Sequence, residues 1–156
     1  MGIVNVTPDS FSGDGLHHQT DAAFDQAMRM MATGADLLDV GAESTRPGAQ
    51  PVGVQEELDR LLPLLEKLVE AGVPVSVDTV KARVMAEAIN LGVGMINDVT
   101  ALADPVAAAV LTPHQTVAVC LMHMQGEPGT MQVAPHYDDV VREVREFLTQ
   151  RVACCR

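Results

Sequence analysis

Basic residues and cysteines are both scarce in this sequence. Lys and Arg number 10 against 21 Asp and Glu in 156 residues, and the formal net charge is -11. This acidic excess disfavours nucleic acid or an anionic membrane as the main partner. The 3 cysteines, Cys120, Cys154 and Cys155, lack the spacing of zinc ligands, and we interpret them as thiols. Cys120 lies in an apolar run, which predicts a small core residue rather than a nucleophile.

The sequence also lacks long hydrophobic runs and an N-terminal signal peptide, so the cytoplasm is the expected location. It contains no G-x-G-x-x-G fingerprint, no G-x-x-x-x-G-K-[ST] loop and no G-x-S-x-G elbow. These absences argue against the common nucleotide-binding and serine-hydrolase chemistries. The apolar share of 47% is typical of a folded globule, and the length fits one domain.

Short apolar runs alternate with amphipathic stretches along the whole chain. The pattern predicts strands at residues 2–6, 36–41, 73–77, 94–99 and 116–122. It predicts helices at residues 20–33, 54–71, 81–91, 104–111 and 138–155. Regular β/α alternation with strands that are apolar on both faces is typical of a parallel sheet covered by helices. Gly34, Gly72 and Gly92 follow three of these helices, where a left-handed cap is expected.

Each expected strand ends in polar residues, and these allow two architectures. They are Asn5, Asp39, Asp78, Asn97 with Asp98, and His123. Length favours an open doubly wound sheet, because a complete eight-unit barrel has roughly 250 residues. Polar groups at all five strand ends favour a barrel, which gathers such residues into one ring. Each Asp or Asn could instead cap the next helix or form a turn.

Two long loops and one charged helix face complete the pattern. The loops at residues 5–15 and 41–48 are rich in turn formers, and loops of this kind commonly carry function. Arg46 lies among hydroxyls and glycines in the second loop, where its guanidinium could hold a carboxylate or phosphate, or simply be solvated. We interpret a further charged group as a solvated helix face: Glu56, Glu57, Asp59 and Arg60.

Five segments together resemble the dihydropteroate synthase family. The strongest are MGIVNVTPDSFS at 1–12 and DVGAESTRPG at 39–48; VSVDT at 75–79, INDV at 96–99 and LMHMQG at 121–126 resemble later strand ends. The resemblance implies an α/β fold, a pterin-binding TIM-type (β/α)8 barrel whose first five units are present, as one domain over residues 1–156. It implies a transferase of folate biosynthesis that condenses p-aminobenzoate with hydroxymethyl-dihydropterin diphosphate, releases diphosphate and is the target of sulfonamides.

The resemblance also assigns roles to strand-end residues. Asp78 and Asn97 are implied to hold the pterin ring, with Asp39 and Met122 lining the pocket. A carboxylate that accepts two donors, beside an amide that donates and accepts, matches the edge of a pterin. Asp39 and Asp78 are the implied catalytic residues, because their charge stabilises the pterin cation that forms when diphosphate leaves.

The loops and the metal complete the implied site. Asn5 resembles the residue that engages Mg²⁺ and the diphosphate, and a hard cation of this kind takes few protein oxygens. The remaining implied residues close on p-aminobenzoate and diphosphate: Asp9, Phe11, Thr45, Arg46 and Pro47. The implied partners are these small molecules, and members of the family are commonly homodimers.

Later motifs of the family are missing from the sequence. They are an aspartate after the sixth strand, a lysine after the seventh and a terminal Arg-x-His. We therefore expect an N-terminal portion of the enzyme, truncated at its C-terminal side, whose turnover depends on the remainder. Two alternatives stay open: a catalytically incomplete pterin-binding fragment, and a pterin-binding methyltransferase-type barrel. The second should lack the ESTRP sequence found here at 43–47.

Overall fold

The computed structural model describes residues 1–6, 16–43 and 52–155. Its strands are β1 (Gly2–Asn5), β2 (Leu38–Gly41), β3 (Val75–Asp78), β4 (Met95–Asp98) and β5 (Ala118–Leu121). Its helices are α1 (Leu16–Ala32), α2 (Val54–Glu70), α3 (Ala82–Leu91), α4 (Pro105–Leu111) and α5 (Val140–Ala153). The expected alternation is confirmed element by element. The largest difference is at α1, which begins four residues earlier than its hydrophobic pattern indicated.

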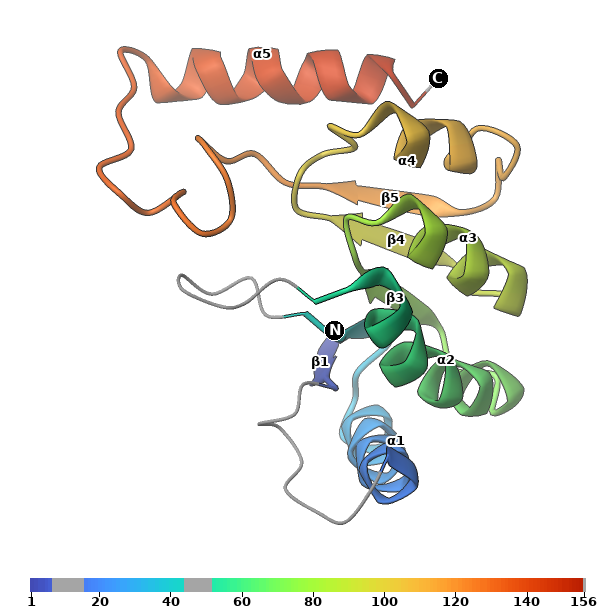
Figure 1. The fold of residues 1–156 in the computed structure, drawn as a ribbon. Coiled ribbons are helices and arrows are strands. Elements are labelled where there is room, and N and C mark those ends of the chain that lie inside the picture. The colour runs from blue at the N-terminus through green and yellow to red at the C-terminus, as the bar shows by residue number, and fades with distance from the viewer. Residues whose placement is uncertain (7–15, 44–51, 156) are drawn as a thin grey trace.

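The five strands form one parallel sheet in the order β1-β2-β3-β4-β5 (Figure 1). This order decides between the two architectures. A doubly wound sheet reverses its strand order at a switch point, whereas a barrel adds each new strand beside the previous one. The expected fold class, the first five β/α units of a TIM-type barrel, is therefore confirmed.

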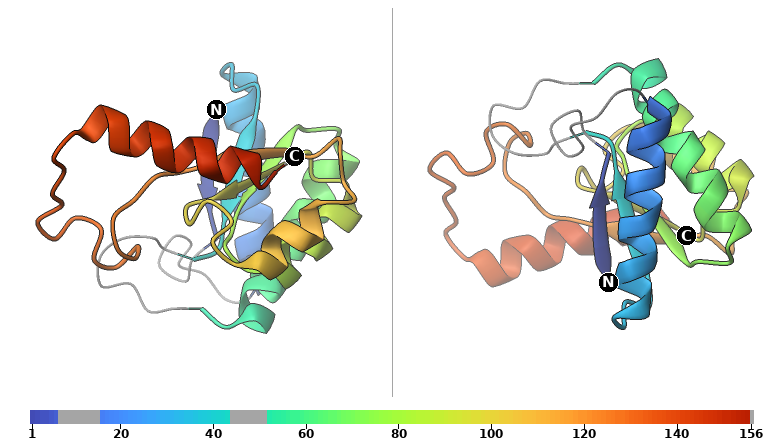
Figure 2. Two further views of the ribbon diagram at one scale, coloured as in Figure 1. Left: turned by 90° about the horizontal axis from the view of Figure 1, so that it is seen from above. Right: turned by 90° about the horizontal axis from the view of Figure 1, so that it is seen from below.

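Helices α1 to α4 lie in chain order over one face of the sheet, each against the next (Figure 2). The core between these layers combines strand residues such as Val40 and Val77 with a leucine-rich face of α2. That face consists of fully or almost fully buried side chains: Leu58, Leu61, Leu64, Leu65 and Leu68. Burial of this apolar area supplies most of the driving force for folding, and it leaves the strand ends free to carry polar groups.

Burial decreases from the middle of the sheet toward its edges. All four residues of β2 are buried, whereas β5 alternates between exposed and half-buried residues. The prediction that Cys120 is a core residue is wrong, because this thiol is exposed. Its strand pairs only with β4 in the described part of the chain, so the apolar run around Cys120 is covered less than a central strand would be.

The glycines expected at helix ends adopt the left-handed conformation. Gly34, Gly72 and Gly92 have φ angles of 104°, 71° and 105°. Gly92 caps α3, and its backbone N–H donates to a carbonyl of the last turn. A residue with a Cβ is strained at such an angle, so the sequence punctuation and the structure agree at these positions.

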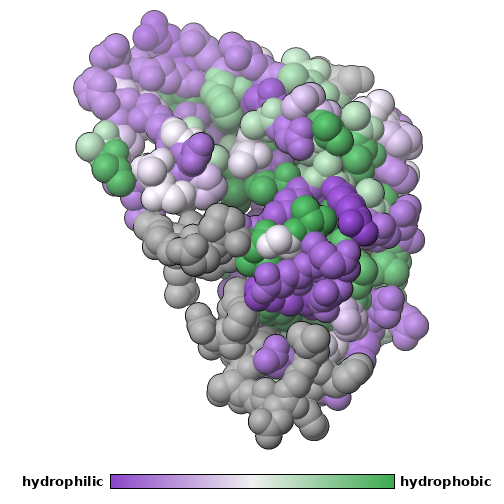
Figure 3. All heavy atoms as spheres, viewed as in Figure 1, coloured by the Kyte–Doolittle hydropathy of each residue, from purple (hydrophilic) through white to green (hydrophobic). Residues whose placement is uncertain are grey.

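Helix α5 has no buried residues and is attached near its C-terminal end. Arg151 donates from Nε to the carbonyl of Ala101 at 2.6 Å and from Nη2 to that of Leu102. In the view of Figure 3, the surface of the α5 region, at the top, is mostly hydrophilic. Among the described residues, no helix combines the length and apolarity needed to cross a membrane.

The N-terminus of α4 gives a first prediction about stability. The carboxylate of Asp104 accepts a hydrogen bond from the N–H of Val106 at 2.9 Å and caps the helix. We expect Asp104→Ala to lower the free energy of unfolding by about 1 kcal/mol, because one helix N–H loses its acceptor. Chemical denaturation measures the change. Asp104→Ser, which keeps a capping oxygen, is the matched control, and equal losses for both variants would contradict the capping role.

Candidate functional site

The strand ends bring four of the expected site residues together at one edge of the sheet. Asn5 pairs with Gly41, Gly41 pairs with Asp78, and Asp78 pairs with Asn97 in the parallel register. Asp39 lies two residues before Gly41 on β2, and its Oδ2 accepts a hydrogen bond from Nδ2 of Asn97 at 3.0 Å. The bond passes over β3. In a barrel, alternate strands contribute side chains to one interior layer, which explains why β2 and β4 meet here.

Gly41 separates the side chains of Asn5 and Asp78. A Cβ placed on Gly41 would be 3.7 Å from Asn5 Oδ1 and 3.7 Å from Asp78 Oδ2. The two oxygens therefore flank the same small volume, which any larger residue at position 41 would begin to fill. This arrangement leaves room beside the carboxylate of Asp78 for a ligand group that interacts with these two side-chain oxygens.

The carboxyl group of Asp78 lies in an electrostatically unfavourable place for a negative charge. Burial raises its pKa to about 6, and the nearby carboxylates of Asp39, Asp98, Glu57 and Glu43 act in the same direction. Both causes disfavour the ionised form. At neutral pH the group is still mainly ionised. A ligand that donates hydrogen bonds to this carboxylate would stabilise its negative charge.

Asp39 carries an acceptor that the protein leaves open. The residue is 6% exposed, and its Oδ1 is buried without a hydrogen-bond partner in the described residues. The hydroxyl oxygen of Ser76, the neighbour of Asp39 in the sheet register, is also buried without such a partner there. Buried polar atoms are normally paired. Unpaired atoms next to the strand ends therefore indicate a place for a polar ligand.

Several other expected residues are less closely tied to this group. Met122 is half-buried, directly after β5, and its N–H donates to the carbonyl of Asp98 at 3.5 Å. Asp98 itself is 0% exposed and accepts hydrogen bonds from the backbone of Thr100 and Leu102. The turn-forming alternative therefore holds at Asp98. His123 packs edge-on against Phe147, with ring centroids 4.9 Å apart.

Asp9, Phe11, Thr45, Arg46 and Pro47 lie outside the described residues. Their implied contacts with p-aminobenzoate and diphosphate stay predictions.

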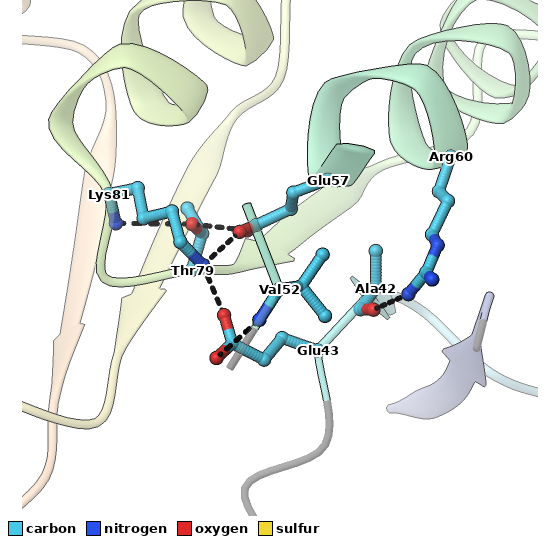
Figure 4. Close-up of polar contacts among 7 residues, drawn as sticks. All are labelled: Ala42, Glu43, Val52, Glu57, Arg60, Thr79 and Lys81. Atoms are coloured by element: carbon cyan, nitrogen blue, oxygen red, sulfur yellow. Dashed lines mark hydrogen bonds and ion pairs between the residues drawn. The ribbon is translucent and has the colours of Figure 1, made fainter. Parts of the chain in front are cut away.

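A charged network beside the strand ends was not expected from the sequence (Figure 4). Glu57 is 0% exposed, so its interpretation as part of a solvated helix face is wrong. Its Oε1 accepts a hydrogen bond from the hydroxyl of Thr79 at 2.6 Å, and its Oε2 pairs with Lys81. Lys81 also pairs with Glu43. One lysine thus joins the end of β2, the start of α2 and the loop after β3.

The Lys81 ammonium is stabilised in its charged form by this network. Burial alone would lower the pKa of the Lys81 ammonium, but hydrogen bonds to Glu43 and Glu57 and the charges of these carboxylates raise it above its ordinary value. Glu43 Oε1 also accepts from the N–H of Val52 at 3.4 Å. Arg60 donates to the carbonyl of Ala42 at 3.1 Å. Residues on both sides of 44–51 are therefore bound to the same charged group.

No group of three or more His, Cys, Asp and Glu side chains that could form a metal site is found in the described ranges. The oxygen of Asn5 beside Asp78 fits a cation that takes a single protein oxygen and completes its shell with water and phosphate.

Comparison with known proteins gives the same family throughout. The profile of the family described as "Pterin binding enzyme" matches residues 1–156. The chain is 47% identical over 156 residues to the dihydropteroate synthase of Escherichia coli strain K12, covering 99% of this chain and 55% of that protein. The chain spans about half the length of the curated relatives it matches.

Solved structures agree with the fold and its extent. Dihydropteroate synthase from Yersinia pestis, in a sulfonamide drug complex, matches with a TM-score of 0.90 and 47% identity over 99% of this chain and 56% of that chain. Dihydropteroate synthase from Burkholderia cenocepacia, complexed with 7,8-dihydropteroate, matches with a TM-score of 0.85 and 46% identity. That match covers 100% of this chain and 52% of the Burkholderia chain.

Proposed function

Because the chain belongs to the family of pterin-binding enzymes, we propose that residues 1–156 form the pterin-binding domain of a dihydropteroate synthase. The reaction joins p-aminobenzoate to hydroxymethyl-dihydropterin diphosphate and gives dihydropteroate and diphosphate for folate synthesis. The observation that carries the proposal is the pairing of Asp39 with Asn97 at 3.0 Å beside the partly buried carboxyl group of Asp78. The relatives named above, all dihydropteroate synthases, support the same reaction.

These strand-end residues suit a pterin because its edge presents a ring N–H and an amino group side by side with a carbonyl oxygen. The carboxylate of Asp78 can accept two such donors, and the amide of Asn97 can donate or accept. The open oxygen of Asp39 offers a further acceptor. A purely apolar pocket could not select a pterin from an analogue that lacks one of these groups.

The carboxylates also fit the proposed chemistry. In that reaction the carbon–oxygen bond to diphosphate breaks, the pterin becomes a stabilised cation, and the amine of p-aminobenzoate forms the new carbon–nitrogen bond and loses a proton. Asp39 and Asp78 place negative charge near the ring that becomes positive, which lowers the energy of the cation. No nucleophilic side chain is needed for either bond change.

Asn5 is the described residue that would hold Mg²⁺, through the Oδ1 that faces the space beside Gly41. The cation supplies charge that stabilises the departing diphosphate. On the other side of the reaction, we propose that Thr45, Arg46, Pro47, Asp9 and Phe11 contact p-aminobenzoate and diphosphate, and that sulfonamides compete there. The cytoplasmic location and the homodimer stay predictions from the sequence.

Calorimetric titration of the 156-residue chain with hydroxymethyl-dihydropterin diphosphate tests the pterin site directly. We expect saturable 1:1 binding, and binding at least about tenfold weaker for the analogue that carries a carbonyl in place of the 2-amino group, because one donor to Asp78 is lost. Equal affinities for both ligands, or no binding of either, would contradict the proposal.

We expect turnover to depend on the part of the enzyme that follows in the relatives, because this chain spans about half of their length. A fusion of residues 1–156 with the remaining part of the Escherichia coli relative tests this expectation. Formation of dihydropteroate by this fusion, but not by the same fusion with Asp39→Ala, would support the enzyme. Binding of the pterin without turnover by the fusion would favour the alternative of a pterin-binding module.

A further inference from the structure

The charged network of Glu43, Glu57 and Lys81, together with Thr79, meets the strand-end group through the backbone, since the N–H of Thr79 donates to the carbonyl of Asn97. Thr79 directly follows Asp78, and Glu43 lies two residues after Gly41. We propose that this network positions the pterin site: it fixes the loop after Asp78 and holds together the residues that precede and follow 44–51. The inference rests on the proposed pterin-binding function.

The loop after Asp78 is held in place by Thr79. The Thr79 hydroxyl donates to Glu57 and also accepts from the N–H of Lys81 at 3.2 Å. The backbone N–H of Thr79 donates to the carbonyl of Asn97 at 3.1 Å. One threonine therefore ties the residue after Asp78 both to α2 and to the strand that carries Asn97. This threonine thus adds to the β3–β4 register, which pairs Asp78 with Asn97, in holding the two strand ends together.

Glu43 and Val52, the residues that flank 44–51, are joined through the same network. Glu43 Oε1 accepts from the N–H of Val52, and its Oε2 pairs with Lys81. Lys81 is in turn paired with Glu57, which α2 buries completely. Without Lys81, Glu43 would have no cation beside it in this network, and its hold on Val52 would be weaker.

The network differs from an ordinary surface ion pair in its burial. Exposed pairs contribute little because water competes with both partners. Here Glu57 is fully buried, the side chains of Lys81 and Glu43 are 18% and 25% exposed, and several partners restrict each charged group. A buried charge of this kind restricts geometry because leaving it without partners is costly. That property suits a positioning role.

Amide hydrogen exchange on the 156-residue chain without ligand tests the network itself. In Lys81→Met we expect exchange at Val52 and Thr79 to accelerate at least about tenfold more than exchange at the amides of the central strand β3, whose acceleration reports the loss of global stability. Lys81→Arg keeps a cation. At these two amides, the logarithm of its protection factor should remain at least half that of the parent chain. Unchanged exchange at both amides in Lys81→Met would overturn the inference, whatever the chain binds.

Calorimetry with hydroxymethyl-dihydropterin diphosphate tests the link to the site. We expect Lys81→Met to weaken the affinity about tenfold and Lys81→Arg to restore it to within about twofold of the parent chain. Leu68→Ala is the control for lost stability, because Leu68 is buried in the same helix but about 16 Å along its axis from Glu57. It should leave the affinity unchanged.

The two proposals fail in different ways. If the parent chain does not bind the pterin, the proposed function is wrong, and hydrogen exchange still decides whether the network holds Val52 and Thr79. If the parent chain binds and Lys81→Met binds equally well, the positioning role is wrong. If Leu68→Ala weakens binding as much as Lys81→Met, the effect is one of stability, and the positioning role is again overturned.

Discussion

Replacing Glu57 with alanine is expected to lower the free energy of unfolding by about 3 to 5 kcal/mol, the usual cost of removing one partner of a buried ion pair. The substitution leaves the Thr79 hydroxyl without its acceptor and leaves Lys81 with one carboxylate instead of two. It also opens a cavity at the start of α2, next to a well-packed core. Chemical denaturation at neutral pH gives the value.

The neighbouring residue supplies a matched control. Glu56 is exposed and pairs with Arg60 one turn along the helix, so Glu56→Ala should cost no more than about 0.5 kcal/mol. Glu57→Gln, which keeps an acceptor for Thr79 but loses the charge, should fall between the two. A loss for Glu57→Ala no larger than that for Glu56→Ala would show that the buried carboxylate does not stabilise the fold.

Glu57 also shows where the sequence could have been interpreted better. Its neighbours Glu56, Asp59 and Arg60 are charged, which is typical of a solvated helix face. However, Glu57 lies 4, 7 and 11 residues before Leu61, Leu64 and Leu68, the spacing that places side chains on one face of a helix. A lone acid in phase with a leucine face indicates a buried charge with a partner. The partner, Lys81, is 24 residues away, and its identity needed the structure.

The strand-end group was more predictable. Each strand was expected from its apolar run, and a parallel sheet places all C-terminal strand ends at one edge. That argument places Asn5, Asp78 and Asn97 together, as observed. It could not place Asp39 against Asn97, because their contact crosses β3 and depends on the stagger of the strands. Side-chain direction along a strand alternates with each residue, so an error of one residue at a strand boundary reverses it.

The limits at β5 have a different physical origin. The run around Cys120 has the composition of a strand buried on both faces, and composition alone does not reveal which strand lies at the edge. The side chain is exposed because β5 has a strand neighbour on one side only in the described part of the chain. Burial is a property of neighbours, so it can be predicted for a central strand and not for one whose neighbours are unknown.

Asp78→Asn is expected to make the chain more stable and unable to bind the pterin tightly. The folded-state pKa of Asp78 is about 6, against an ordinary value of 3.8, so ionising this group costs folded protein more than unfolded protein. A shift of this size corresponds to about 3 kcal/mol. Asparagine has the same shape and no charge, and it therefore removes that cost.

The sign of the pH dependence follows from the raised pKa. Below about pH 4, Asp78 is protonated in both folded and unfolded chains, and the two proteins should be equally stable. Between about pH 4 and 6 the parent loses stability as the unfolded chain releases the proton more readily than the folded one. Above about pH 6 Asp78→Asn should be more stable by up to about 3 kcal/mol. Asp36→Asn, at an exposed position, should follow the parent curve.

The same substitution should weaken binding of hydroxymethyl-dihydropterin diphosphate about 100-fold at pH 8, which corresponds to roughly 2.7 kcal/mol. The reason is that the amide NH2 of asparagine replaces one carboxylate oxygen, so that a donor faces the donors of the pterin. Stability and affinity would then change in opposite directions at one residue, as expected where a site retains a charge that the fold alone would not. Denaturation curves at pH 4 and pH 8, with calorimetry at pH 8, measure both effects. Asp78→Asn that is less stable than the parent at pH 8, or that binds the pterin equally well, would remove Asp78 from the centre of the site.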